Sequence, residues 1–354
     1  MARIAGGAAR LADVAAAAGV SKATVSNVFN RPDVVSAAVQ ERVRAAAAEL
    51  GYRGPDPKGR LLSAGKVNAI GVATSEPLSY FFEDPYSREM MTSVAAACEA
   101  RGAGISLISA ASERELAWNM KSALVDGFIL FCLEDAGGLI EASRERRLPF
   151  VALAFGEGGE GASVVAVDDA AGARIAARHL AELGHRRFAV LAMPFSEGGS
   201  GRTTPERIAA ARYASSAERL RGYGEALGAF GVDVAALPVF EIGTDAEVGP
   251  ALAELFAAPE PPTALLAQSD RIALAALRWL RAEGIAVPER VSVVGFDGVR
   301  DGEASTPPLT TVAQPIEEIG RRAVAAILDA GDEVRRERLD ATLVVRGSSA
   351  PPPA

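Results

Sequence analysis

The side chains with the clearest chemical pattern lie near the N-terminus, in one short predicted helix. Val25, Val28 and Phe29 recur at helical spacing and would form its buried side. The other side is left with small or hydrogen-bonding residues: Ser21, Lys22, Ala23, Ser26, Asn27 and Asn30. Lysine can donate to guanine and asparagine can pair with adenine in the major groove of DNA, which is wide enough to accept a helix. The pattern favours DNA binding, although an ordinary helical hairpin in a protein core would have the same spacing.

Two further helices would hold this one out from a compact base. The first carries its apolar residues on a single stripe: Leu11, Val14, Ala15 and Ala18. Gly19 can end that helix in the left-handed region, and Ser21 is a good N-cap for the next one. The third helix is expected to open at Ser36 and to end at Gly51. The sequence therefore predicts a three-helix headpiece built around a helix-turn-helix.

Charge is divided unevenly along the chain of 354 residues, whose net charge is −8. Residues 1–66 contain ten Lys or Arg and five Asp or Glu, whereas the remainder contains 27 basic and 40 acidic residues. A basic module on an acidic body is expected when only one end of a chain meets phosphate. The length allows two or three domains.

The two cysteines, Cys98 and Cys132, stand in apolar or helical runs and lack metal-ligand spacing. We expect both to be reduced, mostly buried thiols. The N-terminus lacks the apolar core of a signal peptide, and no run approaches the roughly 20 apolar residues of a membrane span. We therefore expect a soluble, cytoplasmic protein without a metal site.

After residue 67, short apolar runs alternate with helical stretches. Nine runs are predicted strands: residues 68–73, 105–109, 127–132, 149–154, 163–168, 187–193, 238–242, 263–268 and 291–297. Strand–helix alternation predicts parallel sheets covered by helices on both faces, and nine strands are more than one twisted sheet comfortably holds. We therefore expect an α/β body of two lobes with a cleft between them. The second lobe would begin near Asp168, and the chain would cross back at residues 297–314.

No metalloprotease motif, redox cysteine pair or phosphate loop occurs in the sequence. The Gly-rich stretch at residues 197–204 lacks the lysine of a phosphate loop, and we predict a mobile surface loop there. His179 and His185 flank the end of a predicted helix, where packing and capping explain them better than catalysis. The sequence predicts neither an enzyme nor a cofactor.

Ligands of open α/β sheets bind at the carboxyl ends of the strands, so the residues that follow the predicted strands are the candidates for a binding site. Asp270 follows one strand, where it could also be only a helix cap. At residues 78–90, Asp84 and Pro85 are typical of a helix start. An aromatic cluster surrounds them: Tyr80, Phe81, Phe82 and Tyr86. Such a cluster beside a polar group suits a sugar or nucleoside ring, and the alternative is a loop packed on the body.

The run LADVAAAAGVSKATVSNVFN, followed by Val35, Ser36 and ERVRAAAAELGY, resembles the headpiece of the lactose/purine repressor (LacI) family. The resemblance extends over residues 68–347, in the runs DGFIL, VAVDDAAGARIAARHLAELGHRRFAVL, RLRGYGEAL, SDRIALAAL, VPERVSVVGFD and PPLTTVAQP. The family's body is similar to periplasmic sugar-binding proteins. The resemblance thus implies an N-terminal three-helix helix-turn-helix headpiece plus a two-lobed periplasmic-binding-protein-like body with parallel sheets.

For the DNA-binding helix, the resemblance implies a division of roles. Lys22, Ala23 and Asn27 match the family's variable base-reading positions, although Lys22 could instead meet only a phosphate. The remaining residues would mostly hold phosphates and set the register: Ser21, Thr24, Ser26 and Asn30.

The linker that follows contains two prolines and three glycines and could be a plain flexible tether. In the family this segment folds on DNA into a short hinge helix, and a leucine wedges into the minor groove. Leu62 matches that leucine, with Leu61 as a near alternative. Gly59 departs from the family's more usual Ala or Val and should weaken the hinge helix by roughly 0.5–1 kcal/mol.

The resemblance also implies roles in the cleft. Asp270 matches an aspartate that binds ligand hydroxyls or amines, and Arg219 matches an arginine that reaches into the cleft. The alternative for Arg219 is a surface position on its helix. With the aromatic segment, the expected effector site comprises Phe82, Asp84, Tyr86, Arg219 and Asp270.

The predicted domains are a headpiece at 1–58, a hinge at 59–66, a two-lobed effector-binding and dimerisation domain at 67–347 and a tail at 348–354. Within the body, the first lobe would span about 67–167 and 297–322, and the second about 168–296 and 323–347. We expect a homodimeric repressor that binds near-palindromic operator DNA and responds to a sugar or nucleoside-like effector. A secreted sugar-binding protein would need a signal peptide, and an enzyme would need a catalytic set.

Overall fold

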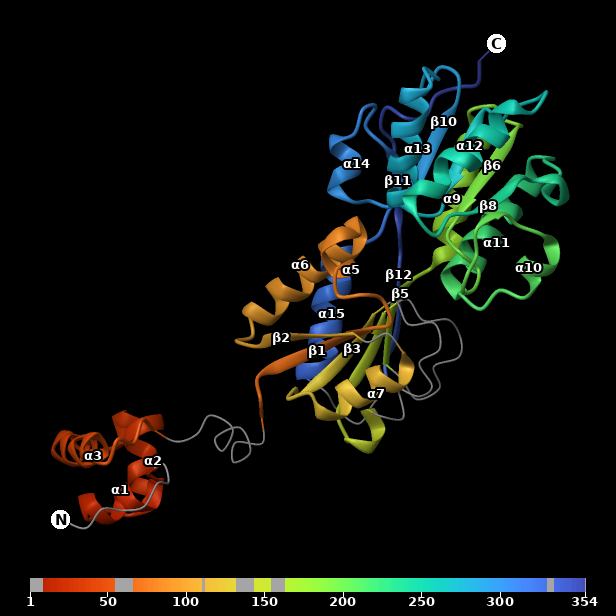
Figure 1. Cartoon of the computed structure of the whole chain (residues 1–354). Coiled ribbons are helices and arrows are strands. Elements are labelled where there is room, and N and C mark those ends of the chain that lie inside the picture. Colours follow the sequence, from red (N-terminus) through yellow and green to blue (C-terminus); the bar gives the residue numbers. More distant parts are fainter. Residues whose placement is uncertain are drawn as a thin grey trace. The chain divides into compact units, whose positions relative to one another are not determined.

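The computed structural model describes residues 9–54, 66–109, 112–131, 143–153, 163–329 and 334–353. Contacts divide the chain into two units, Met1–Val67 and Asn68–Ala354 (Figure 1). The hinge residues Gly59, Leu61 and Leu62 lie outside the described residues, as does Cys132, so the predictions for them stay untested.

The first unit is a bundle of short helices. These are α1 (Leu11–Ala18), α2 (Lys22–Asn30), the 3-10 turn η1 (Pro32–Val34) and α3 (Ala37–Glu49). α1 ends at Gly19, whose φ of +62° lies in the left-handed region that glycine adopts without strain. Small apolar side chains from all three α-helices form the core: Val14, Ala15, Ala18, Val25, Val28, Val43, Ala46 and Ala47. The predicted helix-turn-helix is confirmed, and the Tyr52 ring packs edge-on against Phe29, with 5.7 Å between the ring centroids.

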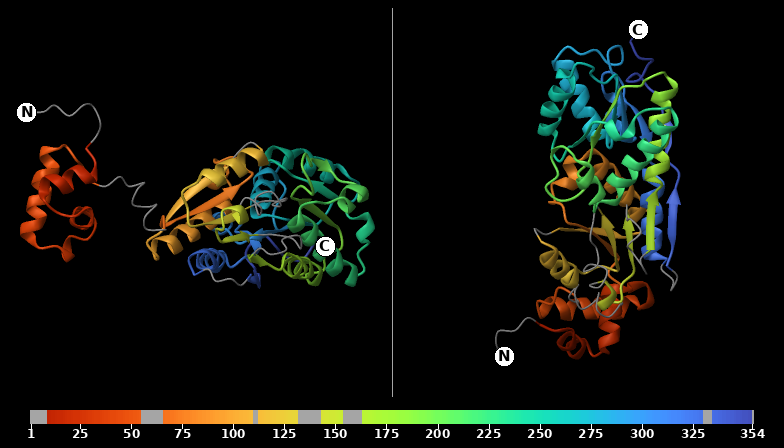
Figure 2. Two further views of the ribbon diagram at one scale, coloured as in Figure 1. Left: turned by 90° about the horizontal axis from the view of Figure 1, so that it is seen from below. Right: turned by 90° about the vertical axis from the view of Figure 1, so that its right-hand side faces the viewer.

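The first lobe of the second unit is a six-stranded parallel sheet (Figures 1 and 2). Its strands lie in the order β12 (Arg336–Leu339), β5 (Ser163–Val167), β4 (Phe150–Leu153), β3 (Gly127–Phe131), β1 (Ala69–Thr74) and β2 (Gly104–Ser109). Apolar residues of α6 (Pro85–Glu99) and α15 (Ile316–Leu328) cover one face, and those of α7 (Glu113–Ser122) cover the other. A short helix, α5 (Tyr80–Glu83), precedes α6. Cys98, a residue of α6, is buried, as predicted.

The second lobe is a seven-stranded sheet that is parallel except at its two edge strands. The order is β13 (Thr342–Val344), β11 (Thr310–Ala313), β10 (Ser292–Asp297), β9 (Ala264–Ala267), β6 (Phe188–Ala192), β8 (Val239–Glu241) and β7 (Gly201–Arg202). α9 (Asp169–Glu182) and α11 (Ala214–Ala229) pack on one face, and α12 (Val248–Ala257) and α13 (Asp270–Ala282) pack on the other. Short elements complete the lobe: α10 (Pro205–Ala209), η2 (Val234–Ala236), η3 (Asp245–Glu247) and α14 (Arg300–Ala304). All nine predicted strands are present.

The chain crosses between the lobes after β5, after β11 and after β12 (Figure 1). The predicted lobe boundaries, with 297–322 in the first lobe and 323–347 in the second, are therefore wrong in part. β11 pairs in parallel with β10, which keeps residues 298–313 in the second lobe. β12 pairs with β5, and the apolar side of α15 packs on α6, so residues 323–329 and 334–339 belong to the first lobe.

The C-terminal residues are an integral part of the second lobe. The Ser348 hydroxyl accepts a hydrogen bond from the Thr310 N–H (2.8 Å) and donates one to the Val293 carbonyl (2.6 Å). The buried His185 ring bonds through Nε2 to the carbonyl of Ala350 (2.8 Å). The segment predicted as a tail at 348–354 thus packs on the sheet over its described part. His185 has the packing role expected for it, and burial lowers its pKa.

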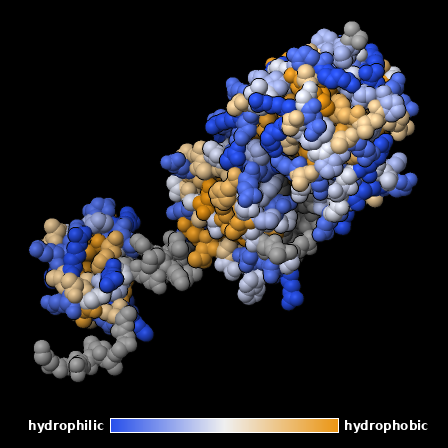
Figure 3. Space-filling view, turned by 45° about the horizontal axis from the view of Figure 1, so that its top comes forward, coloured by the Kyte–Doolittle hydropathy of each residue, from blue (hydrophilic) through white to orange (hydrophobic). Residues whose placement is uncertain are grey.

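The surface of the body is mostly hydrophilic on the face drawn in Figure 3, with a group of apolar side chains on the first lobe. Large apolar side chains of that lobe are exposed at Leu78, Phe82, Trp118 and Leu124. Within the described ranges, every helix is too short or too polar to span a membrane.

Candidate functional site

The exposed side of α2 carries the side chains that the sequence singled out. Ser21, Lys22, Ala23 and Asn30 are exposed, whereas Thr24, Ser26 and Asn27 are half-buried. Lys22 is the only charged residue in the helix. α2 thus presents a small, polar and weakly basic surface of the kind that enters a major groove.

Local hydrogen bonds hold this surface. The Ser21 hydroxyl oxygen accepts a bond from the Thr24 N–H at 3.0 Å, which caps the helix, and the two hydroxyl groups lie 2.8 Å apart. The Asn30 side-chain amide donates to the Ser26 hydroxyl at 3.1 Å. Each bond joins residues three or four apart, so a single helix fixes the arrangement.

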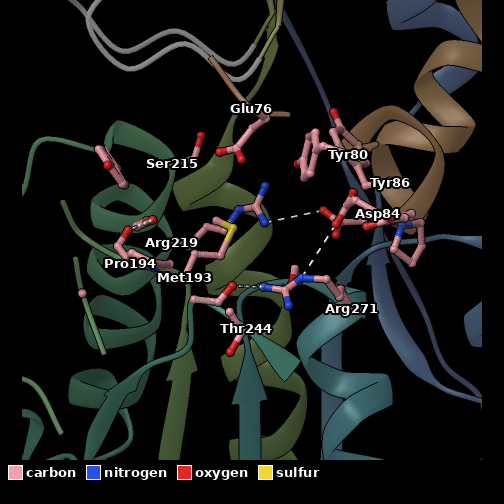
Figure 4. Close-up of a pocket in the computed structure, with 18 of the residues that line it drawn as sticks. Glu76, Tyr80, Asp84, Tyr86, Met193, Pro194, Ser215, Arg219, Thr244 and Arg271 are labelled. Atoms are coloured by element: carbon pink, nitrogen blue, oxygen red, sulfur yellow. Dashed lines mark hydrogen bonds and ion pairs between the residues drawn. The ribbon is translucent and has the colours of Figure 1, made fainter. Parts of the chain in front are cut away.

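A cleft of about 1310 Å³ lies between the two lobes of the second unit. Its walls include residues just beyond the carboxyl ends of β1, β6, β8, β9, β10 and β11, as expected for an open α/β body. Figure 4 shows Glu76, Tyr80, Asp84 and Tyr86 entering from the first lobe and Met193, Arg219 and Arg271 from the second.

Arg219 lines this cleft although it is buried in α11. Its Nε donates to the Asp169 carboxylate at 2.7 Å, and its Nη1 donates to the Gln268 carbonyl and lies 3.5 Å from Asp297 Oδ1. The guanidinium also stacks on the Phe296 ring, 3.7 Å from its centroid. Burial disfavours the charge, but the Asp169 and Asp297 carboxylates outweigh burial and raise the pKa of Arg219.

Asp297, at the end of β10, is the cleft carboxylate that the sequence analysis missed. Its Oδ1 accepts a hydrogen bond from Gln314 Nε2 at 2.8 Å, and its Oδ2 accepts one from the Asp270 N–H at 3.2 Å. Its φ of +128° lies in the left-handed half of the map, a strained backbone typical of functional sites. Burial raises the pKa of Asp297 well above its usual value, against the opposing charge of Arg219.

Asp270, by contrast, is not among the residues that line the cleft, so its predicted contact with the effector is not supported. Its side chain is fully buried, with Oδ2 accepting bonds from the N–H groups of Gly298 (2.8 Å) and Val299 (2.9 Å). Its Oδ1 accepts a bond from the Thr311 hydroxyl at 2.6 Å. Burial raises its pKa to about 6. The network makes Asp270 a support for the backbone that follows Asp297.

Gly295 has to be glycine for this support to fit. A Cβ at this position would lie 2.2 Å from Asp270 Oδ1, closer than atoms can approach. The glycine therefore leaves room for the Asp270 carboxylate behind β10.

Asp84 and Tyr86 line the cleft from the first lobe, as predicted. Asp84 Oδ1 caps α6 by accepting the Ser87 N–H at 2.8 Å, and Oδ2 lies 3.7 Å from Arg271 Nε of the second lobe. Burial raises the pKa of Asp84. The Tyr86 hydroxyl donates to Gln314 Oε1 at 3.3 Å. Gln314, at the crossing after β11, thus joins Tyr86 of one lobe to Asp297 of the other.

The aromatic cluster is divided between the cleft and the surface. Tyr80 and Tyr86 line the cleft, and both rings pack on Phe131, with centroids 6.4 and 6.2 Å from it. Phe81 is buried behind them. Phe82 is 64% exposed and is absent from the cleft lining, so its predicted effector contact is not supported. The turn of α5 directs Phe81 inward and Phe82 outward.

The Gly-rich stretch forms part of the cleft wall and is not only a surface loop. Glu241, buried at the end of β8, accepts hydrogen bonds from the Phe195 N–H and the Thr203 hydroxyl, both at 2.9 Å, and from Arg207 Nε at 2.5 Å. β7 pairs with β8, which anchors the far end of the stretch. Gly199 lies against Glu241, where a Cβ would meet the carboxylate at 2.0 Å. The stretch predicted as a mobile surface loop is therefore anchored to β8 and forms part of the cleft wall.

Comparisons with known families agree with both units. A model described as bacterial regulatory proteins, lacI family, matches residues 10–54, and one described as a periplasmic binding protein-like domain matches residues 177–349. An HTH-type transcriptional regulator of Mycobacterium tuberculosis is 41% identical over 98% of each chain. The HTH-type transcriptional repressor CytR of Escherichia coli is 31% identical over 97% of this chain and 96% of its own.

Solved structures agree as well. The chain is similar to the transcriptional regulator CelR in its complex with cellobiose, with 33% identity, a TM-score of 0.67 and coverage of 96% of this chain and 99% of the other. It is also similar to the lac repressor dimer bound to operator and the anti-inducer ONPF, with 26% identity, a TM-score of 0.76 and coverage of 97% and 99%. The predicted fold class, a helix-turn-helix headpiece with a periplasmic-binding-protein-like body, is confirmed.

Proposed function

Since the chain belongs to the LacI family of bacterial regulatory proteins, we propose that it is a homodimeric, cytoplasmic repressor whose operator affinity is set by a small molecule bound in the cleft. One observation carries the effector part of this proposal. Asp297 is held beside Arg219 in one wall, opposite the aromatic rings of Tyr80 and Tyr86 in the other. Paired donors and acceptors facing an aromatic surface suit a polyhydroxyl ring, so the effector is a sugar or a nucleoside-like molecule.

On the DNA side, α2 enters the major groove of one half-site. Lys22, Ala23 and Asn27 read bases, while Ser21, Thr24, Ser26 and Asn30 contact phosphates. Two headpieces read a near-palindrome, because the symmetry of a dimer is mirrored in its operator. Leu62, in the hinge segment, wedges into the minor groove when the hinge is ordered.

Coupling between the cleft and DNA runs through the crossings between the lobes. Gln314 stands at one crossing and bonds to Tyr86 and to Asp297, so a ligand that engages either partner changes how the two lobes meet. β1, which follows the hinge segment directly, belongs to the first lobe. A change in lobe arrangement therefore alters the ordering of the hinges and, with it, the operator affinity.

The homodimer is supported by the exposed apolar side chains of the first lobe. Leu78 and Phe82 stand four positions apart along the chain and are 47% and 64% exposed. Grouped apolar residues on the surface of a folded protein mark an interaction site. Sedimentation of the full chain should give a dimer mass, and Phe82→Ser should shift it towards the monomer, whereas the control Trp118→Ser should not.

The central experiment selects binding sites for the full chain from a random DNA pool and then screens sugars and nucleosides by thermal shift. We expect an enriched near-palindrome, and at least one compound that raises the melting temperature and changes the affinity for that site. A ligand that binds without changing operator affinity would contradict the coupling. A pool that yields no enriched site would contradict specific repression.

A further inference from the structure

Acidic side chains outnumber basic ones in the lining of the cleft. Nine carboxylates and five guanidinium groups line it, and the described lining contains no lysine. The cleft therefore carries a formal excess of four negative charges in a partly enclosed space, where charges are screened less than at an open surface.

Carboxylates already engage four of the five arginines of the cleft. The ion pairs join Arg88 to Asp301, Arg219 to Asp169 and Asp297, and Arg271 and Arg278 to Asp245. Arg212 also has an interaction of its own. A phosphate group would have to compete with these carboxylates for the guanidinium groups of the four ion-paired arginines, so these four do not form a phosphate site.

Some carboxylates of the lining, in contrast, remain open to a ligand. Among the described residues, Glu76, Glu83 and Glu197 have no ion-pair partner. Figure 4 shows Glu76 and Asp84 pointing into the cleft from the first lobe, towards Arg219 and Arg271 of the second. Burial and the charge of Asp84 raise the pKa of Glu76, which is consistent with the negative field there.

Helix N-termini are the other common phosphate anchors, and three of those at the cleft are capped by side chains of the chain itself. Asp84 caps α6, Asp168 caps α9 by accepting the Ala171 N–H at 2.8 Å, and Ser269 caps α13. α11 starts at Tyr213 without a side-chain cap, as do α5 at Ser79 and α12 at Glu247. The backbone N–H groups of α11 can donate to a ligand hydroxyl without requiring an anion.

We propose that the cleft takes an uncharged polyhydroxyl ligand, such as an unphosphorylated sugar, and rejects the phosphate esters of that ligand. This inference rests on the proposed function, because it specifies the effector of the same cleft. Sugar hydroxyls donate to Glu76 and Asp84 and accept from Arg219, while the ring covers Tyr80 and Tyr86. A phosphate dianion adds negative charge to the existing excess and loses hydration without gaining a free cation.

The test measures binding of matched pairs to the full chain by titration calorimetry at fixed ionic strength. The probes are ribose with ribose 5-phosphate, glucose with glucose 6-phosphate, and cellobiose with cellobiose 6-phosphate. We expect at least one neutral sugar to bind, with its ester at least about ten-fold weaker. The double variant Glu76→Gln/Asp84→Asn should reduce that ratio at least about three-fold, since asparagine retains the cap of α6.

A matched control removes two charges elsewhere on the second lobe. Glu260 and Glu289 are exposed and lie outside the cleft lining, so Glu260→Gln/Glu289→Gln should leave the ratio unchanged. An ester that binds as tightly as its parent sugar would overturn the inference and leave the proposed function standing. Failure of every sugar and every ester to bind would overturn this inference, whereas the proposed function would then depend on the nucleosides of the thermal-shift screen.

Discussion

The recognition helix and the cleft differ in how far apart along the chain their parts lie. In α2, the bonds that fix the exposed side chains join residues three or four apart, such as Ser21 with Thr24. In the cleft, the bond from Tyr86 to Gln314 spans 228 positions, and Arg219 meets its partner Asp169 across 50. The first surface depends on one helix, whereas the second depends on the correct packing of two lobes.

This difference predicts how each surface tolerates substitution. The polar side chains of α2 lie outside the headpiece core, so removing one should change DNA binding and leave the fold intact. The polar groups behind the cleft wall accept hydrogen bonds from buried backbone N–H groups. Removing one should therefore destabilise the lobe as well as weaken ligand binding. Asp270, which lies behind the cleft wall, and Asp297, which lines the cleft, allow the two effects to be measured separately.

Asp270→Ala should have the largest effect, a loss of about 3–5 kcal/mol in the free energy of unfolding of the body. It leaves the N–H groups of Gly298 and Val299 and the Thr311 hydroxyl without their buried acceptor, and each such loss costs about 1–3 kcal/mol. Urea unfolding monitored by circular dichroism measures it. Asp270→Asn keeps one oxygen for the two N–H groups and should cost less than half as much; equal losses would contradict the assigned network.

Asp297→Asn should have the next largest effect, chiefly on ligand binding and to a smaller extent on the fold, because asparagine keeps only one of the two oxygens that accept the Gln314 and Asp270 bonds. The sugar that binds the wild type most tightly is the probe. Loss of the acceptor in the cleft should weaken its binding by about 1.5–3 kcal/mol, or roughly ten- to one hundred-fold in affinity. Titration calorimetry measures the affinity. Asp270→Asn is the matched control, since its side chain does not line the cleft. If Asp270→Asn lost ligand affinity and Asp297→Asn kept it, the contact between Asp270 and the effector that the sequence predicted would be supported instead.

The sequence predicted what depends on neighbours along the chain. The apolar stripe of α1, the turn at Gly19 and the cap at Ser21 are all local, and they were predicted correctly. The nine buried strands were also predictable, because a short apolar run between helices has few other places to go. Four strands were missed: the edge strands β7, β12 and β13, and β11, which lies between β13 and β10.

Features that depend on packing were predicted less well. Asp270 and Asp297 both follow buried strands, and only the fold decides which carboxylate faces the cleft. Asp270, the first residue of α13, is turned inwards by two N–H groups supplied after β10. The crossing was misplaced for the same reason, because nothing local to residues 298–313 reveals that β11 pairs with β10.

Lys22 offers a test of the other surface, where the fold should be unaffected. If Lys22 reads a base, Lys22→Ala should relax the preference at one operator position by about 1–3 kcal/mol. If it meets a phosphate, affinity should fall evenly across sequences and the salt slope should drop by about one unit. Site selection from a random pool distinguishes the two outcomes. The same selection with Asn27→Ala should change a second position, and an unchanged preference would exclude Asn27 from base reading.

Ser21 should show the smallest effect, because it combines a local cap with a phosphate contact. Ser21→Ala removes the acceptor of the Thr24 N–H and should destabilise the headpiece by about 1 kcal/mol, weakening all DNA sequences alike. Ser21→Asp separates the two roles, since aspartate also caps a helix but repels phosphate. Fluorescence anisotropy with operator and random DNA should give a larger loss for Ser21→Asp than for Ser21→Ala, while the headpiece stays folded by circular dichroism. Equal affinity in Ser21→Asp and wild type would place Ser21 away from the DNA backbone and leave it only its role as a helix cap.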